Sequence, residues 1–112
     1  MKPIDLGHGH TLRFMAWAPD RELNPKYNGI PDVERYAAVI EHPPGPIAEW
    51  KKGLIEHRCR GIVTFAGEVQ RRIQPNKPVW EVGSWDPLTI SPSVLCSCGD
   101  HGFIREGRWV PA

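Results

Sequence analysis

The sequence predicts a small, mainly antiparallel β domain with one short α-helix. Twelve prolines and eleven glycines divide the 112 residues into short segments joined by turns. Several of these segments alternate along the chain or are rich in β-branched and aromatic residues, as strands are. Only one segment has clear helical spacing. A chain of this length fits a single core, so we expect one domain over residues 1–112.

The first half of the chain contains two predicted strands. "TLRFMAWAP" (11–19) alternates between two faces, and Pro19 ends it. The prolines, glycine and asparagines of residues 20–32 predict a surface loop. Residues 33–42, "VERYAAVIEH", also fit helical spacing, but we favour a strand. Residues 46–57, "PIAEWKKGLIEH", predict the helix, because three apolar residues share one face behind Pro46.

The second half predicts further short strands. "GIVTFAGEVQRRI" (61–73) is interpreted as a strand, a tight turn at Ala66-Gly67 and a returning strand. Residues 78–96 predict two short strands, divided at Gly83 and again by the prolines. Residues 102–110, "GFIREGRWV", predict a hairpin with Glu106-Gly107 as its two-residue loop.

Charge and cysteine content exclude several classes of protein. Fourteen Lys and Arg against thirteen Asp and Glu give a formal charge of +1, so a dedicated nucleic-acid binder is not expected. No apolar run approaches the ~20 residues of a membrane span, and "MKPIDLGHGH" has no secretory h-region. An odd number of cysteines argues against a disulfide framework. We therefore expect a cytoplasmic protein, in the host cytoplasm if the gene is carried by a phage.

The segment "LCSCGDHGFIREGRWV" (95–110) suggests a metal site. Cys96, Cys98 and His101 form C-x-C-x-x-H around Gly99, which lets the backbone turn tightly. Zinc takes thiolate and imidazole ligands in a tetrahedron, so a fourth ligand must come from elsewhere, and Cys59 is the first choice. The other candidates for this position are His8, His10, His42 and His57. The alternative is that both cysteines are small buried residues and His101 belongs to a turn.

The segment from Trp80 to Trp109 resembles a family of small uncharacterised bacterial and phage proteins. Their shared pattern is a tryptophan strand, S-P-S with an aliphatic residue, a cysteine-rich turn ending in His, and F-I-R-x-G-R. The matching residues are Trp80, Pro87, Ser91, Pro92, Ser93, Val94, Cys96, Cys98, His101, Phe103, Ile104, Arg105, Gly107 and Arg108.

This resemblance implies a zinc site in which the C-terminal Cys and His residues take part. Family members commonly carry a second knuckle, C-P-x-C, near the N-terminus, but this chain has "HTLRFMAWAPD" there, without cysteine. Some bacterial relatives lie beside genes for ubiquitin-like conjugation, and others lie in phage genomes. Neither setting identifies an activity.

The sequence indicates binding rather than catalysis, so no catalytic or cofactor-binding residue is assigned. Ser91 and Ser93 flank Pro92 without a G-x-S-x-G elbow, and we expect them to be turn-forming hydroxyls. Asp100 is interpreted as a turn residue. We expect a zinc-stabilised accessory protein that binds a protein partner through an exposed tryptophan. The alternatives are a metal-dependent hydrolase, a nucleic-acid accessory factor and a phage structural component.

Overall fold

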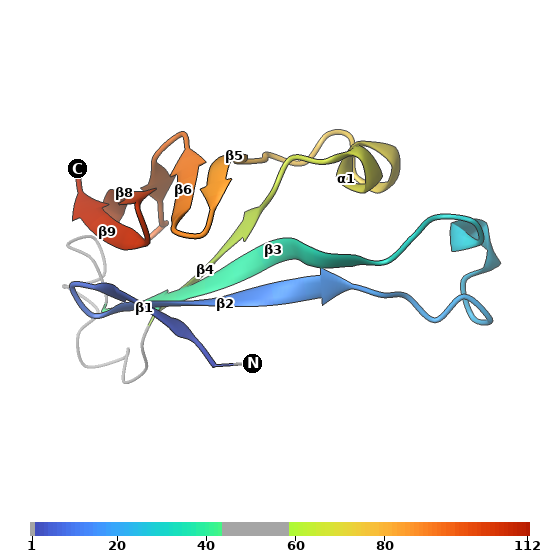
Figure 1. Ribbon diagram of the computed structural model, residues 1–112, viewed down its shortest axis with the longest axis horizontal. Helices are drawn as coiled ribbons and strands as arrows, with labels where there is room; N and C mark the ends of the chain where they lie inside the picture. Colours follow the sequence, from blue (N-terminus) through green and yellow to red (C-terminus); the bar gives the residue numbers. More distant parts are fainter. Residues whose placement is uncertain (1, 44–58) are drawn as a thin grey trace.

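The computed structural model describes residues 2–43 and 59–112, arranged in two layers (Figure 1). One layer is a four-stranded antiparallel sheet in the order β1-β2-β3-β4. The short C-terminal strands cover one face of that sheet near the turn between β1 and β2. The far half of the β2–β3 hairpin projects beyond them, which gives the molecule a length of 46 Å against 31 and 28 Å in the other directions. The prediction of a mainly antiparallel β fold is confirmed.

The four-stranded sheet consists of β1 (Ile4–Gly7), β2 (His10–Trp17), β3 (Val33–His42) and β4 (Cys59–Thr64). Leu12 pairs with Ile40, and both side chains are buried on the inner face, whereas Arg13 on the opposite face is exposed. The predicted strands over 11–19 and 33–42 are thus confirmed. The loop between them contains only a 3-10 turn, η1 (Pro25–Tyr27).

The C-terminal half forms two small antiparallel sheets. In the first, β5 (Glu81–Trp85) pairs with β6 (Leu88–Ser91). In the second, β8 (His101–Arg105) lies between β7 (Val94–Leu95) and β9 (Arg108–Pro111). The predicted break at Gly83 is wrong, since the strand continues through a bulge there and turns back at Asp86-Pro87.

The predicted returning strand after Gly67 is also wrong. This segment forms the helix α1 (Glu68–Ile73), which follows Gly67 in an extended conformation. Glu68 lies in its first turn and two arginines in its last, the charge distribution that the helix dipole favours. The apolar residues of this segment fit both the two-residue period of a strand and the 3.6-residue period of a helix. The charges at its two ends favour the helix. The helix predicted over residues 46–57 lies outside the described residues.

The last hairpin turns as predicted, with positive φ at both loop residues, 50° at Glu106 and 73° at Gly107. Gly107 N–H donates to the carbonyl of Leu88, which attaches the loop to the neighbouring sheet.

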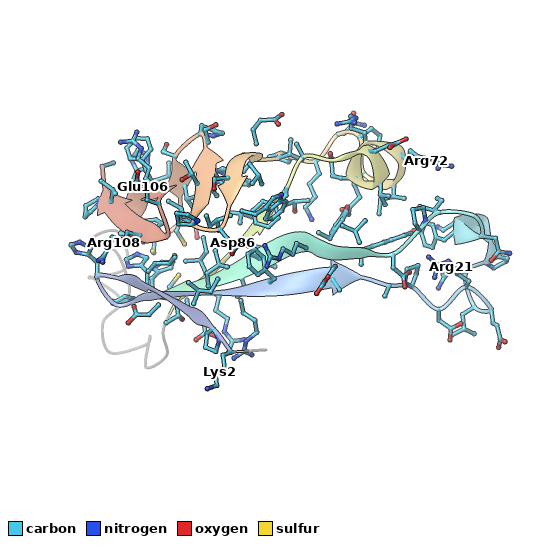
Figure 2. All side chains as sticks on the ribbon, viewed as in Figure 1. Lys2, Arg21, Arg72, Asp86, Glu106 and Arg108 are labelled. Carbon is cyan, nitrogen blue, oxygen red and sulfur yellow. The ribbon has the colours of Figure 1, made fainter. Side chains whose placement is uncertain are left out.

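The hydrophobic core lies between the two layers. It contains Leu6, Leu12, Ala38, Ile40, Val63, Phe65, Leu88, Ile90, Val94, Ile104 and Trp109, with Trp80 packed against it. Figure 2 shows side chains filling this space, whereas the labelled Lys2 and Arg72 point outward. Both tryptophans that flank the cysteine turn in sequence therefore contribute to the core. None of the described helices has the length and apolar character needed to cross a bilayer.

Candidate functional site: a cysteine–histidine cluster beside a serine–histidine pair

Three cysteines and one histidine meet at one end of the core. Cys59, Cys96, Cys98 and His42 each point one ligand atom inward, and these atoms all lie within 4.8 Å of one another. His42 ends β3 and lies directly opposite Cys59, the first residue of β4. Cys96 and Cys98 belong to the turn between β7 and β8. The cluster therefore joins the edge of the large sheet to the C-terminal sheet.

The donor set of this cluster suits a structural zinc ion. Three thiolates and one imidazole fill a tetrahedron completely and leave no open position for water. Without a cation the Cys59 thiol resists ionisation: burial raises the pKa of Cys59 to about 12, and the hydrogen bonds to its cysteine neighbours and their charges add to the shift. A bound divalent cation reverses this preference, because it stabilises the thiolate form.

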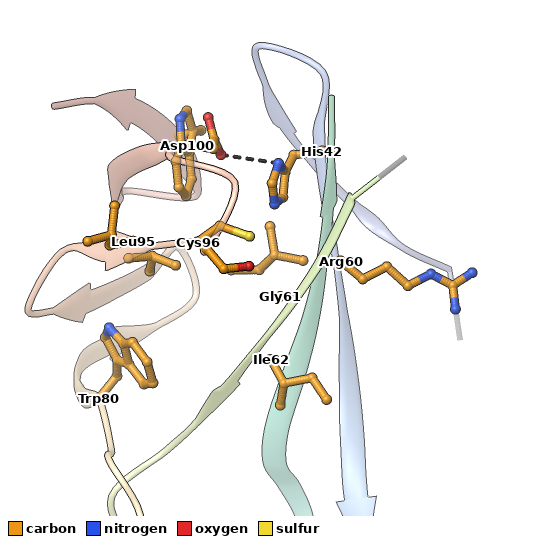
Figure 3. Close-up of a pocket in the computed structure, with 12 residues that line it drawn as sticks. His42, Arg60, Gly61, Ile62, Trp80, Leu95, Cys96 and Asp100 are labelled. Atoms are coloured by element: carbon orange, nitrogen blue, oxygen red, sulfur yellow. Dashed lines mark ion pairs between the residues drawn. The ribbon is translucent and has the colours of Figure 1, made fainter. Parts of the chain in front are cut away.

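His42 is held in the orientation that a metal ligand needs. Its Nδ1 lies 2.9 Å from the carbonyl of Pro43 and 3.3 Å from Asp100 Oδ2, as the dashed line in Figure 3 shows. Nδ1 is thereby the protonated nitrogen, and Nε2 keeps its lone pair for a metal. A carboxylate behind a ligating histidine is a common outer-shell arrangement, and it fixes the ring and its tautomer. The side chain of His42 is 2% exposed.

His10 completes the support of Asp100. Its Nε2 lies 2.7 Å from Asp100 Oδ2 and its Nδ1 lies 2.8 Å from the carbonyl of His8, so both nitrogens face oxygen atoms that accept hydrogen bonds. The ring stacks on Trp109 at 4.1 Å and on His42 at 5.3 Å. His8 lies in the β1–β2 turn with φ 53°, so the two histidines of "GHGH" do not share a strand face.

The structure brings together the three cysteines predicted from sequence, but His101 is not in their cluster. Its Nε2 lies 2.8 Å from the hydroxyl oxygen of Ser93. In the antiparallel pair β7–β8, His101 is opposite Leu95, which places its side chain diagonally across from the residue two positions earlier, Ser93. Ser93 is also held through its backbone, because Trp80 Nε1 donates to its carbonyl at 3.2 Å.

The serine–histidine pair had no local motif to reveal it. The turn could have indicated it. When Cys96 to Asp100 form a turn between two strands, residues before the turn lie beside residues at a similar distance after the turn. Among residues 2–43 and 59–112, Ser93 is the one serine whose hydroxyl is hydrogen-bonded to a histidine ring. The carboxylate of Asp100 contacts His10 and His42. Asp100 therefore does not serve as a third, acidic member of the Ser93–His101 pair.

A family model described as "Bacterial ubiquitination-like system serine protease (BubE)" matches residues 47–112, which is more than half of the chain. The chain belongs to the BubE family. This family belongs to a bacterial ubiquitination-like system. The matched residues include the segment from Trp80 to Trp109, where the sequence resemblance was found. No curated protein and no solved structure matches the chain.

The BubE description directs attention to the serines of the matched region. Ser93 and His101 both lie within it, as do Cys59, Cys96 and Cys98, whereas His42 lies before it. The BubE match thus covers the serine–histidine pair completely and the cysteine cluster except for one member. The ligand set of Cys59, Cys96, Cys98 and His101 stays a prediction, and the geometry offers His42 in place of His101.

Proposed function

We propose that the chain is a serine protease in which Ser93 is the nucleophile and His101 the general base. The observation that carries the proposal is the 2.8 Å contact between Ser93 Oγ and His101 Nε2. A serine hydroxyl is a weak nucleophile unless an adjacent base accepts its proton, and this contact is within the range that such pairs show. The description of the BubE family as a serine protease supports the same assignment.

The proton transfers and the covalent bond of the proposed reaction involve these two side chains. His101 Nε2 accepts the hydroxyl proton while Ser93 Oγ forms a bond to the carbonyl carbon of the substrate. The proton then passes to the leaving nitrogen as the peptide bond breaks, and an acyl ester remains on Ser93. A water molecule, deprotonated by His101, hydrolyses this ester and restores the hydroxyl. His101 is an exposed residue of β8, so a substrate can approach the pair from solvent.

The cysteine cluster has a supporting role in this proposal. A zinc ion held by His42, Cys59, Cys96 and Cys98 has four protein ligands, which is the pattern of a structural site. Two of these ligands lie in the turn that connects the strand after Ser93 to the strand that begins with His101. The metal would therefore fix the geometry of the nucleophile and its base. This argues against metal-bound water as the nucleophile.

The family description also suggests the substrate. We propose a peptide bond in a protein of a ubiquitination-like system, cleaved in a reducing cytoplasm where the cysteine cluster stays unoxidised. The non-enzymatic binding function expected from sequence stays a prediction. A test of whether Ser93 reacts as a nucleophile distinguishes it from proteolysis.

The test is covalent labelling of the nucleophile. A fluorophosphonate probe should phosphonylate wild-type protein at Ser93 with loss of fluoride, located by peptide mass spectrometry, and Ser93→Ala should abolish both labelling and hydrolysis of p-nitrophenyl acetate. His101→Gln should slow labelling by about 10²-fold or more, because the base is lost. Ser91→Ala is the matched control, since Ser91 is the other serine beside Pro92 and has no histidine partner among the described contacts.

Two results would contradict the proposal. Absence of any label on folded, zinc-loaded wild-type protein would leave Ser93 without nucleophilic character. Labelling that persists in Ser93→Ala and disappears in Ser91→Ala would move the nucleophile. If neither serine reacts and the protein still captures a specific partner, the binding function replaces proteolysis.

A further inference from the structure

Among the described residues, the β4 edge of the four-stranded sheet has two positions that no strand covers. The N–H of Phe65 donates to Tyr36 on β3, whereas Thr64 O and Ala66 N bond to Trp80 on the other side. Because successive residues of a strand point their backbone groups to opposite sides, Arg60 and Ile62 point theirs away from β3. Within residues 2–43 and 59–112, no strand pairs with β4 at these two positions. Among the described residues, the outward backbone groups of Arg60 and Ile62 therefore have no strand partner.

Across the pocket from this edge, β7 has an outer side that no other described strand covers. On β7, Cys96 N–H bonds to Asp100 O toward β8, so the backbone groups of the preceding residue, Leu95, point away from β8. The Ser93 carbonyl points to this same outer side and accepts the hydrogen bond from Trp80 Nε1. β7 pairs with β8 alone among the described strands. Leu95 is 66% exposed.

A groove separates these two edges. It has a volume of about 200 Å³ and is lined on one side by Arg60, Gly61 and Ile62 and on the other by Trp80, Leu95 and Cys96 (Figure 3). Buried residues of both layers, including Ile40 and Trp109, form its floor. Trp80 closes one end, since its backbone occupies the next position along the β4 edge while its indole reaches Ser93.

We propose that the substrate binds as an extended peptide strand that pairs with the β4 edge at Arg60 and Ile62. This rests on the proposed function and specifies how that site holds its substrate. The occupant is a peptide backbone because the groove offers N–H and C=O groups with strand spacing, which an extended chain satisfies by strand addition. The exposed Ile62 and Leu95 favour apolar or small side chains on it. Trp80 lines this groove and its Nε1 donates to the carbonyl of Ser93, so the groove lies next to the backbone of the proposed nucleophile.

The experiment compares a substrate that has a backbone with one that has none. The peptide probe is the octapeptide cleaved fastest by wild-type protein from a fluorophore–quencher library, and the ester probe is p-nitrophenyl acetate. Ile62→Pro removes the outward N–H at a position where an edge strand tolerates proline, and Ile62→Val keeps it. We expect the peptide-to-ester ratio of kcat/KM to be about tenfold lower in Ile62→Pro than in Ile62→Val, as loss of one hydrogen bond predicts.

A second measurement does not depend on the folding of a variant. Octapeptides N-methylated at one amide at a time are tested on wild-type protein, and KM should rise at alternate amides only, because one side of a strand pairs with β4. An unchanged ratio in folded Ile62→Pro, or methylation effects without a two-residue period, overturns strand pairing. So does a protein that hydrolyses the ester through Ser93 and cleaves no library member. Failure of the proposed function gives a different result, because hydrolysis of the ester would then survive in Ser93→Ala.

Discussion

The indole of Trp109 lies directly against the backbone of Gly102, and Gly102→Ala tests how much the site depends on this contact. A Cβ atom at Gly102 would lie 2.5 Å from Trp109 Cζ2 and 2.8 Å from its Nε1. Real Cβ atoms do not approach this closely, so the ring must move. Gly102 cannot give way easily, because β8 is paired on both sides. Overpacking of this kind typically costs about 1–3 kcal/mol.

This cost converts into a measurable change in melting temperature. An unfolding entropy of about 2.1 cal/mol/K per residue makes 1 kcal/mol equal to about 4 °C here, so Tm should fall by about 4–13 °C. Zinc content should fall too, since Trp109 stacks on His10, which holds Asp100 behind His42.

Differential scanning calorimetry and elemental analysis measure the two effects. The control is Gly61→Ala, whose Cβ would meet nothing within 4 Å, and its Tm should not fall. A Gly102→Ala protein with unchanged Tm and zinc would refute the stacked arrangement.

Three further predictions concern the metal and the last hairpin. In His42→Ala, zinc retained after gel filtration should fall well below the roughly one ion per chain expected for a four-ligand site, whereas His101→Ala should retain it; the reverse order would support the ligand set with His101. Zinc affinity, measured by competition titration, should fall as the pH is lowered, because protons compete for thiolates and burial raises the pKa of Cys59; a flat profile would exclude thiolate ligation. Gly107→Val should lower the stability by about 1 kcal/mol or more, since φ is +73°, with Gly107→Asn losing less, and equal denaturation midpoints would count against the turn.

The sequence predicted those features that depend on neighbouring residues. The hairpin at Glu106-Gly107 was predicted correctly because its loop chemistry and its flanking strands are local. Cys96 and Cys98 were recognised because their spacing and Gly99 lie within one turn. In α1 the prediction failed, since six residues carry too few apolar positions to distinguish a helix from a strand.

The site residues that were missed depend on pairing between distant segments. His42 was one of several candidates, and only the β3–β4 register places it opposite Cys59. Ser93 was interpreted as a turn residue because no elbow motif surrounds it. Its contact with His101 follows from the β7–β8 register, which a spacing pattern does not state. The spacing of the turn residues thus predicted His101 as a metal ligand, whereas the structure places His101 in a hydrogen bond with Ser93.

The turn that holds Cys96, Cys98 and Asp100 has a consequence for how this protein would be classified in a biochemical assay. Within the described C-terminal sheet, this turn connects β7, which follows Ser93, to β8, which begins at His101. In the proposed protease, a chelator that removed a zinc ion from the cluster would loosen this connection and separate nucleophile from base, although the ion would take no part in bond breaking. Extracts treated with a chelator would then lose the proposed activity, and a serine-directed inhibitor would abolish it equally. Inhibitor profiling alone would then suggest a metalloprotease and a serine protease at once.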